Sequence, residues 1–244
     1  MTRLLDGKTV LITAAAGTGI GFAAARRCAE EGARVFLSDA HERRLADAAA
    51  SLGAPSARCD VTREDDVTAL FAAAIAEFGQ IDVLINNAGL GGTRALVDMT
   101  DEEWARVLDV TLTGTMRMTR AALRHMVPRR AGVIVNNASV LGWRAQAGQA
   151  HYAAAKAGVM ALTRCAAMEA APSGVRVNAV APSLAMHAHL SKVTPPGLLE
   201  ELTAREAFGR AAEPIEVANV MVFLASDLSS YLTGEVLSVS SQHP

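Results

Sequence analysis

Short apolar runs rich in β-branched residues alternate along the chain with longer stretches whose apolar positions recur at helical spacing. The runs expected to form strands are residues 9–13, 34–38, 56–59, 83–86, 133–137, 175–180 and 236–239. The stretches expected to form helices lie near residues 20–31, 41–52, 62–78, 100–126, 150–171 and 214–226. This alternation predicts an α/β protein in which a parallel sheet carries helices on both faces.

No linker, internal repeat or block of charge divides the sequence, so residues 1–244 are expected to form a single domain. The segment 183–212 departs from the regular alternation and contains a Pro-Pro-Gly sequence. Because it follows the carboxyl end of the sixth expected strand, it is expected to form a substrate loop. His187 and His189 in this segment are expected to line or cap the loop. They have no carboxylate partner at helical spacing, so no metal site is expected.

Composition narrows the classes of protein that the chain can represent. Hydrophobic residues make up 51% of the sequence, which is enough to build a large core. The net charge of -2 and the absence of a basic stripe argue against nucleic-acid binding. The start of the sequence lacks the pattern of a signal peptide, and no apolar run reaches the roughly 18 residues of a membrane span. Three widely spaced cysteines without a CxxC pair fit a reduced protein, and a cytoplasmic location is expected.

A glycine-rich turn follows the first expected strand and leads directly into a helix. Glycines at such a turn let the backbone approach a pyrophosphate, and the helix N-terminus supplies N–H donors to it. An ordinary tight turn is the alternative, but the position after the first strand favours a dinucleotide site. The residues of this turn expected to contact a cofactor are Ala15, Gly17, Thr18, Gly19, Ile20 and Gly21.

Asp39 ends the second expected strand. A carboxylate at that position can accept hydrogen bonds from both hydroxyls of an adenine ribose and repels a 2′-phosphate. NAD is therefore favoured over NADP. The alternative role of Asp39 is to cap the next helix, and Arg43 and Arg44 are near enough in sequence to reach a phosphate.

The ends of the third and fourth expected strands supply further candidates for the cofactor site. Asp60 and Val61 follow the third strand and are expected to contact adenine, with capping of the next helix as an equal alternative. Asn87, Ala88 and Gly89 follow the fourth strand. Their amide and glycine allow a tight hydrogen-bonded loop beside a cofactor, with an ordinary Asn-rich turn as the alternative.

Tyr152 and Lys156 are four residues apart in an expected helix, so their side chains lie on one helical face. An ammonium held beside a phenol favours the phenolate and lowers a pKa that is usually about 10. Tyr152 is therefore expected to act as an acid and base near neutral pH. Ser139 closes the fifth expected strand, and its hydroxyl is expected to meet the Tyr152–Lys156 pair around one carbonyl oxygen.

Taken in order, these motifs resemble the short-chain dehydrogenase/reductase family over essentially the whole chain. The resemblance rests on the glycine-rich turn, Asn86-Asn87-Ala88-Gly89, Ser139, Tyr152-x-x-x-Lys156, Asn178-Ala179-Val180-Ala181-Pro182 and Tyr231-Leu232-Thr233-Gly234. It implies a Rossmann fold with a doubly wound sheet of seven parallel strands, and a homotetramer or homodimer. It also implies that Tyr152 exchanges a proton with the substrate oxygen, that Ser139 bonds this oxygen, and that Lys156 binds the nicotinamide ribose. Pro182 is expected to lie at the cofactor, and a hydride is expected to move to or from nicotinamide C4.

The chain departs from the family pattern at three places. The turn between Thr13 and Gly19 is one residue longer than usual, and Ala14 replaces its first glycine. Thr111 stands where the family usually has an Asn in a proton relay, and its hydroxyl can still hold a water. Ser183 replaces a glycine after the proline of the sixth strand.

Residues 14–21, residues 137–146 and the ending Ser-x-Gln-His-Pro resemble one bacterial subgroup of the family. That subgroup contains the hydroxy-indanone-carboxyl-CoA dehydrogenase of steroid C/D-ring breakdown, so the resemblance implies a secondary ring alcohol on a bicyclic acyl-CoA thioester. Trp143, Arg144 and Gln149 are expected near the pocket mouth. There Trp143 could stack on a flat ring and Arg144 could pair with a CoA phosphate. A packing tryptophan and a surface arginine are equal alternatives.

Two other functions remain open from the sequence. An NADPH-dependent reductase of 3-oxoacyl carriers is disfavoured by Asp39 and by the absence of Lys or Arg in the glycine-rich turn. A dinucleotide-sensing protein without catalysis is disfavoured by the intact set of Ser139, Tyr152 and Lys156.

Overall fold

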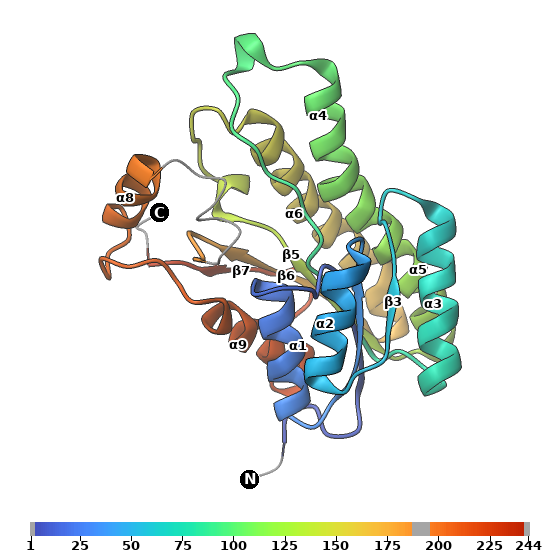
Figure 1. Cartoon of the computed structure of the whole chain (residues 1–244). Helices are drawn as coiled ribbons and strands as arrows, with labels where there is room; N and C mark the ends of the chain where they lie inside the picture. The colour runs from blue at the N-terminus through green and yellow to red at the C-terminus, as the bar shows by residue number, and fades with distance from the viewer. Residues whose placement is uncertain (1–2, 187–195, 242–244) are drawn as a thin grey trace.

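A computed structural model of the chain describes residues 3–186 and 196–241 (Figure 1). Within them, seven strands form one parallel sheet in the order β3-β2-β1-β4-β5-β6-β7. The strands are β1 (Thr9–Ile12), β2 (Arg34–Asp39), β3 (Ser56–Arg58), β4 (Val83–Asn86), β5 (Gly132–Asn137), β6 (Val175–Pro182) and β7 (Val236–Val239). The chain winds outward from β1 to β3 and then returns to continue from β4. This confirms the doubly wound sheet of seven parallel strands.

Helices cover both faces of the sheet (Figure 1). They are α1 (Ile20–Glu30), α2 (Glu42–Leu52), α3 (Glu64–Phe78), α4 (Asp101–Leu108), α5 (Gly114–Arg129), α6 (Ala150–Ala170), α8 (Pro196–Ala204) and α9 (Pro214–Ala225). Buried residues of α1, α2 and α9 form one apolar cluster, and those of α3, α5 and α6 form another. The sheet therefore lies between two helical layers.

Strand β1 shows how the sequence builds this arrangement. Its four residues are all fully or almost fully buried. Val10 and Ile12 belong to the cluster on the side of α1, whereas Leu11 belongs to the cluster on the side of α3. Successive side chains of a strand point to opposite faces, so a strand covered on both sides needs a continuous apolar run.

The sequence predicts one continuous helix over residues 100–126, and this prediction is wrong because the structure has two helices there. Thr100 caps α4 through a capping box with Glu103, and a π-helical segment, Asp109–Thr113, then separates α4 from α5. Gly114 starts α5 against Val61, whose Cγ2 would lie 2.6 Å from a Cβ at that position. A side chain there would push the helix off the loop that follows β3. A wider helical turn is often found at functional sites.

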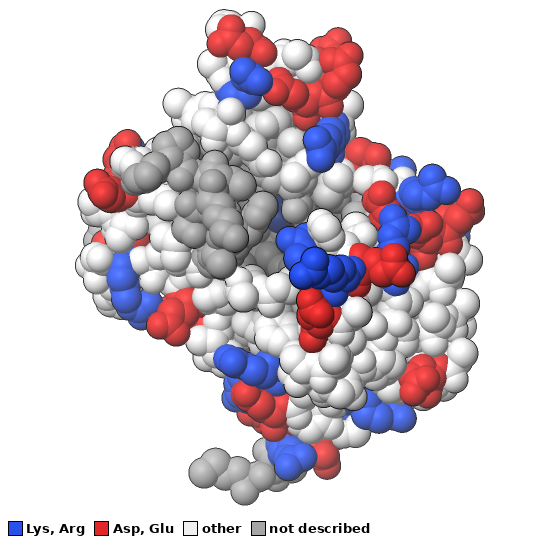
Figure 2. Space-filling model, in the orientation of Figure 1, with Lys and Arg blue, Asp and Glu red and all other residues white. Residues whose placement is uncertain are grey.

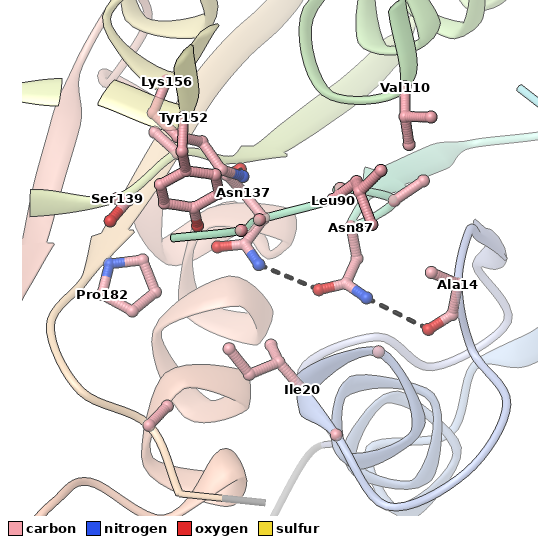
Figure 3. Close-up of a pocket in the computed structure, with 18 of the residues that line it drawn as sticks. Ala14, Ile20, Asn87, Leu90, Val110, Asn137, Ser139, Tyr152, Lys156 and Pro182 are labelled. Carbon is pink, nitrogen blue, oxygen red and sulfur yellow. Dashed lines mark hydrogen bonds between the residues drawn. The ribbon is translucent and has the colours of Figure 1, made fainter. Parts of the chain in front are cut away.

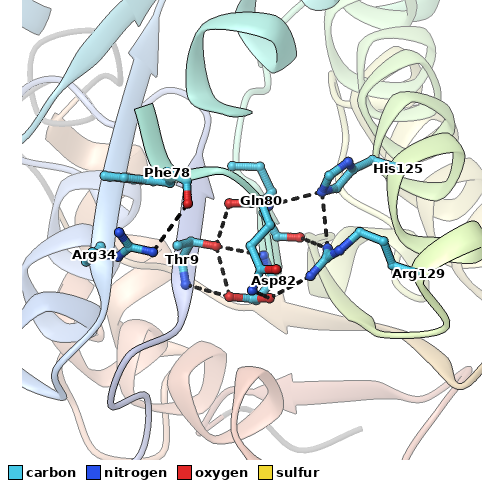
Figure 4. A network of polar contacts seen from close by, with 8 residues as sticks. Thr9, Arg34, Phe78, Gln80, Asp82, His125 and Arg129 are labelled. Carbon is cyan, nitrogen blue, oxygen red and sulfur yellow. Dashed lines mark hydrogen bonds and ion pairs between the residues drawn. The ribbon is translucent and has the colours of Figure 1, made fainter. Parts of the chain in front are cut away.

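A polar network ties β1, β4 and α5 together at the amino ends of the strands (Figure 4). Asp82 accepts hydrogen bonds from the backbone N–H of Thr9 at 3.0 Å and from the guanidinium of Arg129 at 3.1 Å. Arg129 also donates to the carbonyl oxygen of Ile81, whose N–H donates to Nε2 of His125. The network lies at the edge of the sheet opposite the carboxyl ends of the strands, so it holds the fold together away from the ends where the site forms.

The expected substrate loop is described in part, because His187 and His189 lie outside the described residues. Its first residues pair with its last through a parallel bridge between Ala185 and Ala212. Between them, α8 is a helix that the sequence interpretation did not include. The carboxylate of Glu206, which is buried, accepts a hydrogen bond from Ser241 Oγ at 2.8 Å and so joins the base of this excursion to the segment after β7.

On the face shown in Figure 2, acidic and basic side chains are interspersed, and acidic side chains gather over the projecting end of α4. The first turn of α4 carries Asp101, Glu102 and Glu103, a placement that suits the positive end of a helix dipole. None of the helices in the described parts of the chain combines the length and apolar character of a membrane span.

Candidate active site

A cavity of about 1990 Å³ opens at the carboxyl ends of β1, β2, β4, β5 and β6. Pockets for single small ligands usually measure about 300–1000 Å³, so this cavity has room for a cofactor and a substrate together. The predicted site residues that line it are Gly17, Thr18, Gly19, Ile20, Gly21, Asp39, Asp60, Val61, Asn87, Ala88, Gly89, Ser139, Arg144, Gln149, Tyr152, Lys156 and Pro182. Three predicted residues, Ala15, Thr111 and Trp143, are not among its lining.

The lengthened glycine-rich turn is held on both sides by hydrogen bonds. The N–H of Ala15 donates to Ser38 O at 2.9 Å, and the N–H of Ala16 donates to Asp39 Oδ2 at 3.2 Å. On the other side, Asn87 Nδ2 donates to the carbonyl oxygen of Ala14 at 3.1 Å. Ala14 adopts a φ of 48°, a left-handed conformation that costs an alanine about 1–2 kcal/mol. These bonds fix the path of the turn although its first glycine is missing.

Gly21 shows why the start of α1 needs a glycine. A Cβ at Gly21 would lie 2.2 Å from Ala14 O and 2.5 Å from Asn87 Nδ2. Both atoms belong to the turn and to the loop after β4, so neither can give way cheaply. The N-terminus of α1 therefore packs closely against the turn, which is how a Rossmann fold presents N–H groups to a pyrophosphate.

Asp39 lies half-buried at the end of β2, where it accepts two backbone hydrogen bonds. Its Oδ1 accepts the N–H of His41 at 2.8 Å, and its Oδ2 accepts the N–H of Ala16. The N-cap of α2 is His41, so the alternative role of Asp39 as the helix cap is wrong. Each carboxylate oxygen has two lone pairs, so Asp39 can still accept hydrogen bonds from ribose hydroxyls.

Asp60 forms a local turn after β3 and does not cap the next helix. Its Oδ1 accepts hydrogen bonds from the N–H of Thr62 at 3.0 Å and from the Thr62 hydroxyl at 2.7 Å. The N-cap of α3 is Arg63. The capping alternative is therefore wrong here too, and Asp60 and Val61 remain at the wall of the cavity.

Ser139, Tyr152 and Lys156 come together at one end of the cavity (Figure 3). Ser139 follows β5, and the other two residues lie on successive turns of α6. Lys156 is buried, and its Nζ donates to the carbonyl oxygen of Asn137 at 2.5 Å. The three residues thus line one part of the cavity, and their expected meeting around one oxygen atom stays a prediction.

The expected lowering of the Tyr152 pKa is not found in this structure. Burial raises the pKa of Tyr152, and the hydrogen bond with Ser139 offsets part of that rise. The ammonium of Lys156 lies over the Tyr152 ring, 5.5 Å from its centroid, and not beside the hydroxyl. Burial also lowers the pKa of Lys156 to about 8.

Thr111 is fully buried in the π-helical segment, where its hydroxyl has two partners. Oγ1 donates to the carbonyl oxygen of Leu90 at 3.0 Å and accepts the N–H of Leu90 at 2.9 Å. Gly89 lies between Thr111 and Lys156, because a Cβ there would be 3.8 Å from Thr111 Oγ1 and 3.4 Å from Lys156 Nζ. Thr111 therefore holds the loop that lies between it and Lys156, while its expected part in a proton relay stays a prediction.

Asn137 is a site residue that the sequence interpretation did not include. It ends β5 and lines the cavity, and its Nδ2 donates to Asn87 Oδ1 at 2.9 Å (Figure 3). Within the described chain, its Oδ1 is buried without a hydrogen-bond partner. The signal available in the sequence was a pair of amides, Asn136 and Asn137, at the end of a strand that is apolar before them.

Two of the three residues expected at the substrate end line the cavity, and the third does not. Arg144 lines the cavity. Gln149 also lines it, but its Nε2 donates to Thr93 Oγ1 at 3.1 Å and so ties the loop before α6 to the loop after β4. Trp143 is 51% exposed and lies outside the lining. Its expected stacking on a substrate ring therefore has no support from the geometry.

Helix α8 and the residue after it add three lining residues that the sequence interpretation did not single out: Leu198 and Leu202 of α8, and Arg205 just beyond its end. They give the substrate end an apolar wall with a cation at its edge. In the described parts of the chain, no group of three or more His, Cys, Asp or Glu side chains could hold a metal ion.

Comparison with known proteins gives the site its class. The family model described as "Enoyl-(Acyl carrier protein) reductase" matches residues 14–241. The chain belongs to the short-chain dehydrogenase/reductase family, and it is an oxidoreductase of the kind that binds a nicotinamide dinucleotide.

The similarity extends to individual relatives. The chain is 62% identical over 248 residues to the (5R,7aS)-5-hydroxy-7a-methyl-1-oxo-2,3,5,6,7,7a-hexahydro-1H-indene-carboxyl-CoA reductase of Mycobacterium tuberculosis, covering 99% of this chain and 95% of that protein. It is 44% identical over 237 residues to the cis-4-hydroxycyclohexanecarboxylate dehydrogenase of Sinomonas cyclohexanicum, covering 94% of each. A crystal structure of a short chain dehydrogenase from Mycobacterium smegmatis is 57% identical, with a TM-score of 0.88, over 99% of this chain and 95% of that one. The resemblance to the indanone-carboxyl-CoA subgroup is thereby confirmed.

The 3-oxoacyl-carrier reductases are more distant relatives. The 3-oxoacyl-[acyl-carrier-protein] reductase of Thermotoga maritima is 38% identical over 240 residues, covering 96% of this chain and 97% of that protein. The alternative function expected from the sequence therefore has weaker support than the leading one.

Proposed function

We propose that the protein is an NAD-dependent oxidoreductase that interconverts a secondary alcohol and a ketone on a cyclic acyl-CoA thioester. The observation that carries the proposal is the 62% identity, over 99% of the chain, to a reductase of a bicyclic carboxyl-CoA. The cavity supports it, because Ser139, Tyr152 and Lys156 line one end and an apolar helix lines the substrate side.

Tyr152 is the acid and base of the proposed reaction. In the direction of oxidation, its phenolate takes the proton of the substrate hydroxyl, and in the direction of reduction its phenol returns a proton to the carbonyl oxygen. Ser139 donates a hydrogen bond to the same oxygen and stabilises the negative charge that develops there. Lys156 supplies a positive charge that favours the phenolate, and it binds the ribose of the nicotinamide nucleotide. The bound nicotinamide ring supplies the acceptor or donor of the hydride.

Residues at the other end of the cavity fit a dinucleotide. Gly21 lets the N-terminus of α1 pack closely against the glycine-rich turn, where backbone N–H groups can meet a pyrophosphate. Asp39 stands at the end of β2, and its carboxylate oxygens have further lone pairs for ribose hydroxyls. A carboxylate at this place repels the 2′-phosphate of NADP. These features support NAD, although Arg44 also lines the cavity.

The substrate end fits an acyl-CoA. Leu198 and Leu202 of α8 offer apolar contact for a ring system, and Arg144 and Arg205 offer cations for the phosphates of CoA. The guanidinium of Arg205 pairs with Glu201 one turn earlier, so a phosphate would compete with an exposed ion pair of small worth.

A screen of alcohols and cofactors tests this proposal. Purified protein should oxidise ring-hydroxylated acyl-CoA thioesters with NAD at least about tenfold faster, in kcat/KM, than straight-chain 3-hydroxyacyl-CoAs. It should also prefer NAD to NADP, because Asp39 repels the added phosphate. A clear preference for NADP(H) would reject the cofactor assignment, and a preference for straight-chain substrates would favour the 3-oxoacyl reductase alternative.

The sensor alternative predicts a different result. If Tyr152→Phe left both cofactor binding and the biological role unchanged, the protein would act as a dinucleotide sensor without catalysis. The homotetramer or homodimer and the cytoplasmic location expected from the sequence remain proposals of the same kind.

A further inference from the structure

A series of three hydrogen bonds, made through the side-chain amides of Asn87 and Asn137, connects the glycine-rich turn to Lys156 (Figure 3). It starts at the carbonyl oxygen of Ala14, which accepts a hydrogen bond from Asn87 Nδ2 at 3.1 Å. Asn87 Oδ1 accepts Nδ2 of Asn137 at 2.9 Å, and the backbone carbonyl of Asn137 accepts Nζ of Lys156 at 2.5 Å. The four residues come from the ends of β1, β4 and β5 and from α6, and all of them line the cavity, so this series of hydrogen bonds runs along the cavity wall.

The orientation of each amide follows from this order. The carbonyl oxygen of Ala14 can only accept, so Asn87 must turn its Nδ2 toward it and present Oδ1 to Asn137. Asn137 must therefore turn its Nδ2 toward Asn87. Its Oδ1 is left at the opposite end of the amide, on the side where Figure 3 draws Tyr152 and Ser139.

This Oδ1 atom is the unusual feature. It is buried, it has no hydrogen-bond partner among the described residues, and Asn137 lines the cavity. Buried polar groups in native proteins are nearly always paired, so an unpaired acceptor at a cavity wall marks a place for a donor from a ligand. A pyrophosphate offers no donor, whereas the hydroxyls of a ribose do.

We propose that Asn137 is a cofactor-binding residue whose Oδ1 accepts a hydrogen bond from a hydroxyl of the ribose next to nicotinamide. The inference rests on the proposed function, in which Lys156 binds this same ribose. Lys156 Nζ already bonds the backbone carbonyl of Asn137. One ribose hydroxyl can therefore accept a hydrogen bond from the Lys156 ammonium and donate one to the Asn137 amide oxygen. Through Asn87, Asn137 also joins this contact to the turn that receives the pyrophosphate.

Binding of two ligands to Asn137→Leu tests the proposal without using activity. NADH contains the nicotinamide ribose, whereas ADP contains the adenosine and both phosphates but not that ribose. We expect Asn137→Leu, which keeps the approximate volume of the amide, to raise the Kd of NADH about tenfold and to leave the Kd of ADP unchanged. Titration calorimetry measures both constants, and Asn137→Ala is the second variant should the leucine prevent folding.

Asn86 provides a matched control. Its Oδ1 is likewise buried without a partner in the described chain, but it lies within the sheet and does not line the cavity. Asn86→Ala should lower the melting temperature and leave the ratio of the two Kd values unchanged.

The remaining outcomes are distinct. Equal weakening of NADH binding and ADP binding would show that Asn137 only shapes the glycine-rich turn. Unchanged affinities for both ligands would show that Asn137 contacts neither ligand. Either result overturns the inference. Failure of the unaltered protein to bind NADH would instead reject the proposed function.

Discussion

Lys156 and Tyr152 lie in the same buried corner of the cavity, and burial disfavours the charged form of both. It lowers the pKa of Lys156 to about 8 and raises the pKa of Tyr152. Above about pH 8, both side chains are therefore neutral, Lys156 as an amine and Tyr152 as a phenol. Below about pH 8 the Lys156 ammonium is charged, while Tyr152, whose pKa is raised by burial, stays a neutral phenol. In the proposed reaction, the phenolate would require a closer interaction between the Lys156 ammonium and the Tyr152 hydroxyl than burial alone provides.

Thr111 is the residue whose role the structure changes most. Thr111→Val removes the hydroxyl that both donates to and accepts from Leu90, which leaves two backbone groups without their partner. We expect kcat to fall at least about tenfold, because small displacements near reacting groups are costly. Affinity for NADH should change little, since Thr111 does not line the cavity.

Thr111→Ser is the matched control, because it keeps the hydroxyl and should retain most of the turnover. Steady-state rates and NADH titrations on the two variants decide the matter. An unchanged rate in Thr111→Val would show that neither the loop nor the proton route depends on this hydroxyl.

At the scale of whole elements, the network at the amino ends of β1 and β4 makes stability depend on pH. Burial lowers the pKa of His125, and the nearby Arg129 lowers it further. Its Nε2 must stay unprotonated to accept the N–H of Ile81. Burial opposes the ionisation of Asp82, but the hydrogen bonds from Thr9, Arg129 and Gln80 outweigh it and hold its pKa below the usual value.

His125→Gln tests the effect of this network on stability. A group with a lowered pKa in the folded state stabilises fully above its unfolded pKa, here 6.5, and loses that contribution as pH falls toward the folded value. The free energy of unfolding of the unaltered protein should thus fall between pH 7.5 and 5.5, and the fall should be smaller in His125→Gln. Urea unfolding at several pH values measures it. Parallel pH curves for the two proteins would contradict this account.

Elements with strong periodicity could be predicted from the sequence, and their interruptions could not. Strand β1 is apolar from Val10 to Ile12 because it is covered on both faces, and such runs identify strands well. The break between α4 and α5 was missed because Asp109–Thr113 keeps helical character while its hydrogen bonds shift register. Asn137 was missed for another reason: its partner Asn87 is fifty residues away in sequence and meets it only because β4 and β5 are neighbours.

At the scale of the whole molecule, strand order places the site. The order in which strands are added to the sheet reverses between β1 and β4, and the cavity lies at the carboxyl ends of the strands at this switch point. The glycine-rich turn forms one side of the cavity, while the end of β5 and helix α6 form another. Helix α8 closes the substrate side, and its base is tied to the segment after β7 through Glu206. One cavity is thereby lined by the glycine-rich turn, by Tyr152 and by residues of α8.

The most direct test of this account compares the unaltered protein with Tyr152→Phe, using NAD and a ring-hydroxylated acyl-CoA. We expect kcat/KM to fall by about 10²–10⁴-fold in the variant, because the phenylalanine can neither take nor return the proton. The Kd of NADH should remain within about threefold, since the ring and its packing are kept. Rapid oxidation of the alcohol by Tyr152→Phe, at a rate close to that of the unaltered protein, would contradict the central claim.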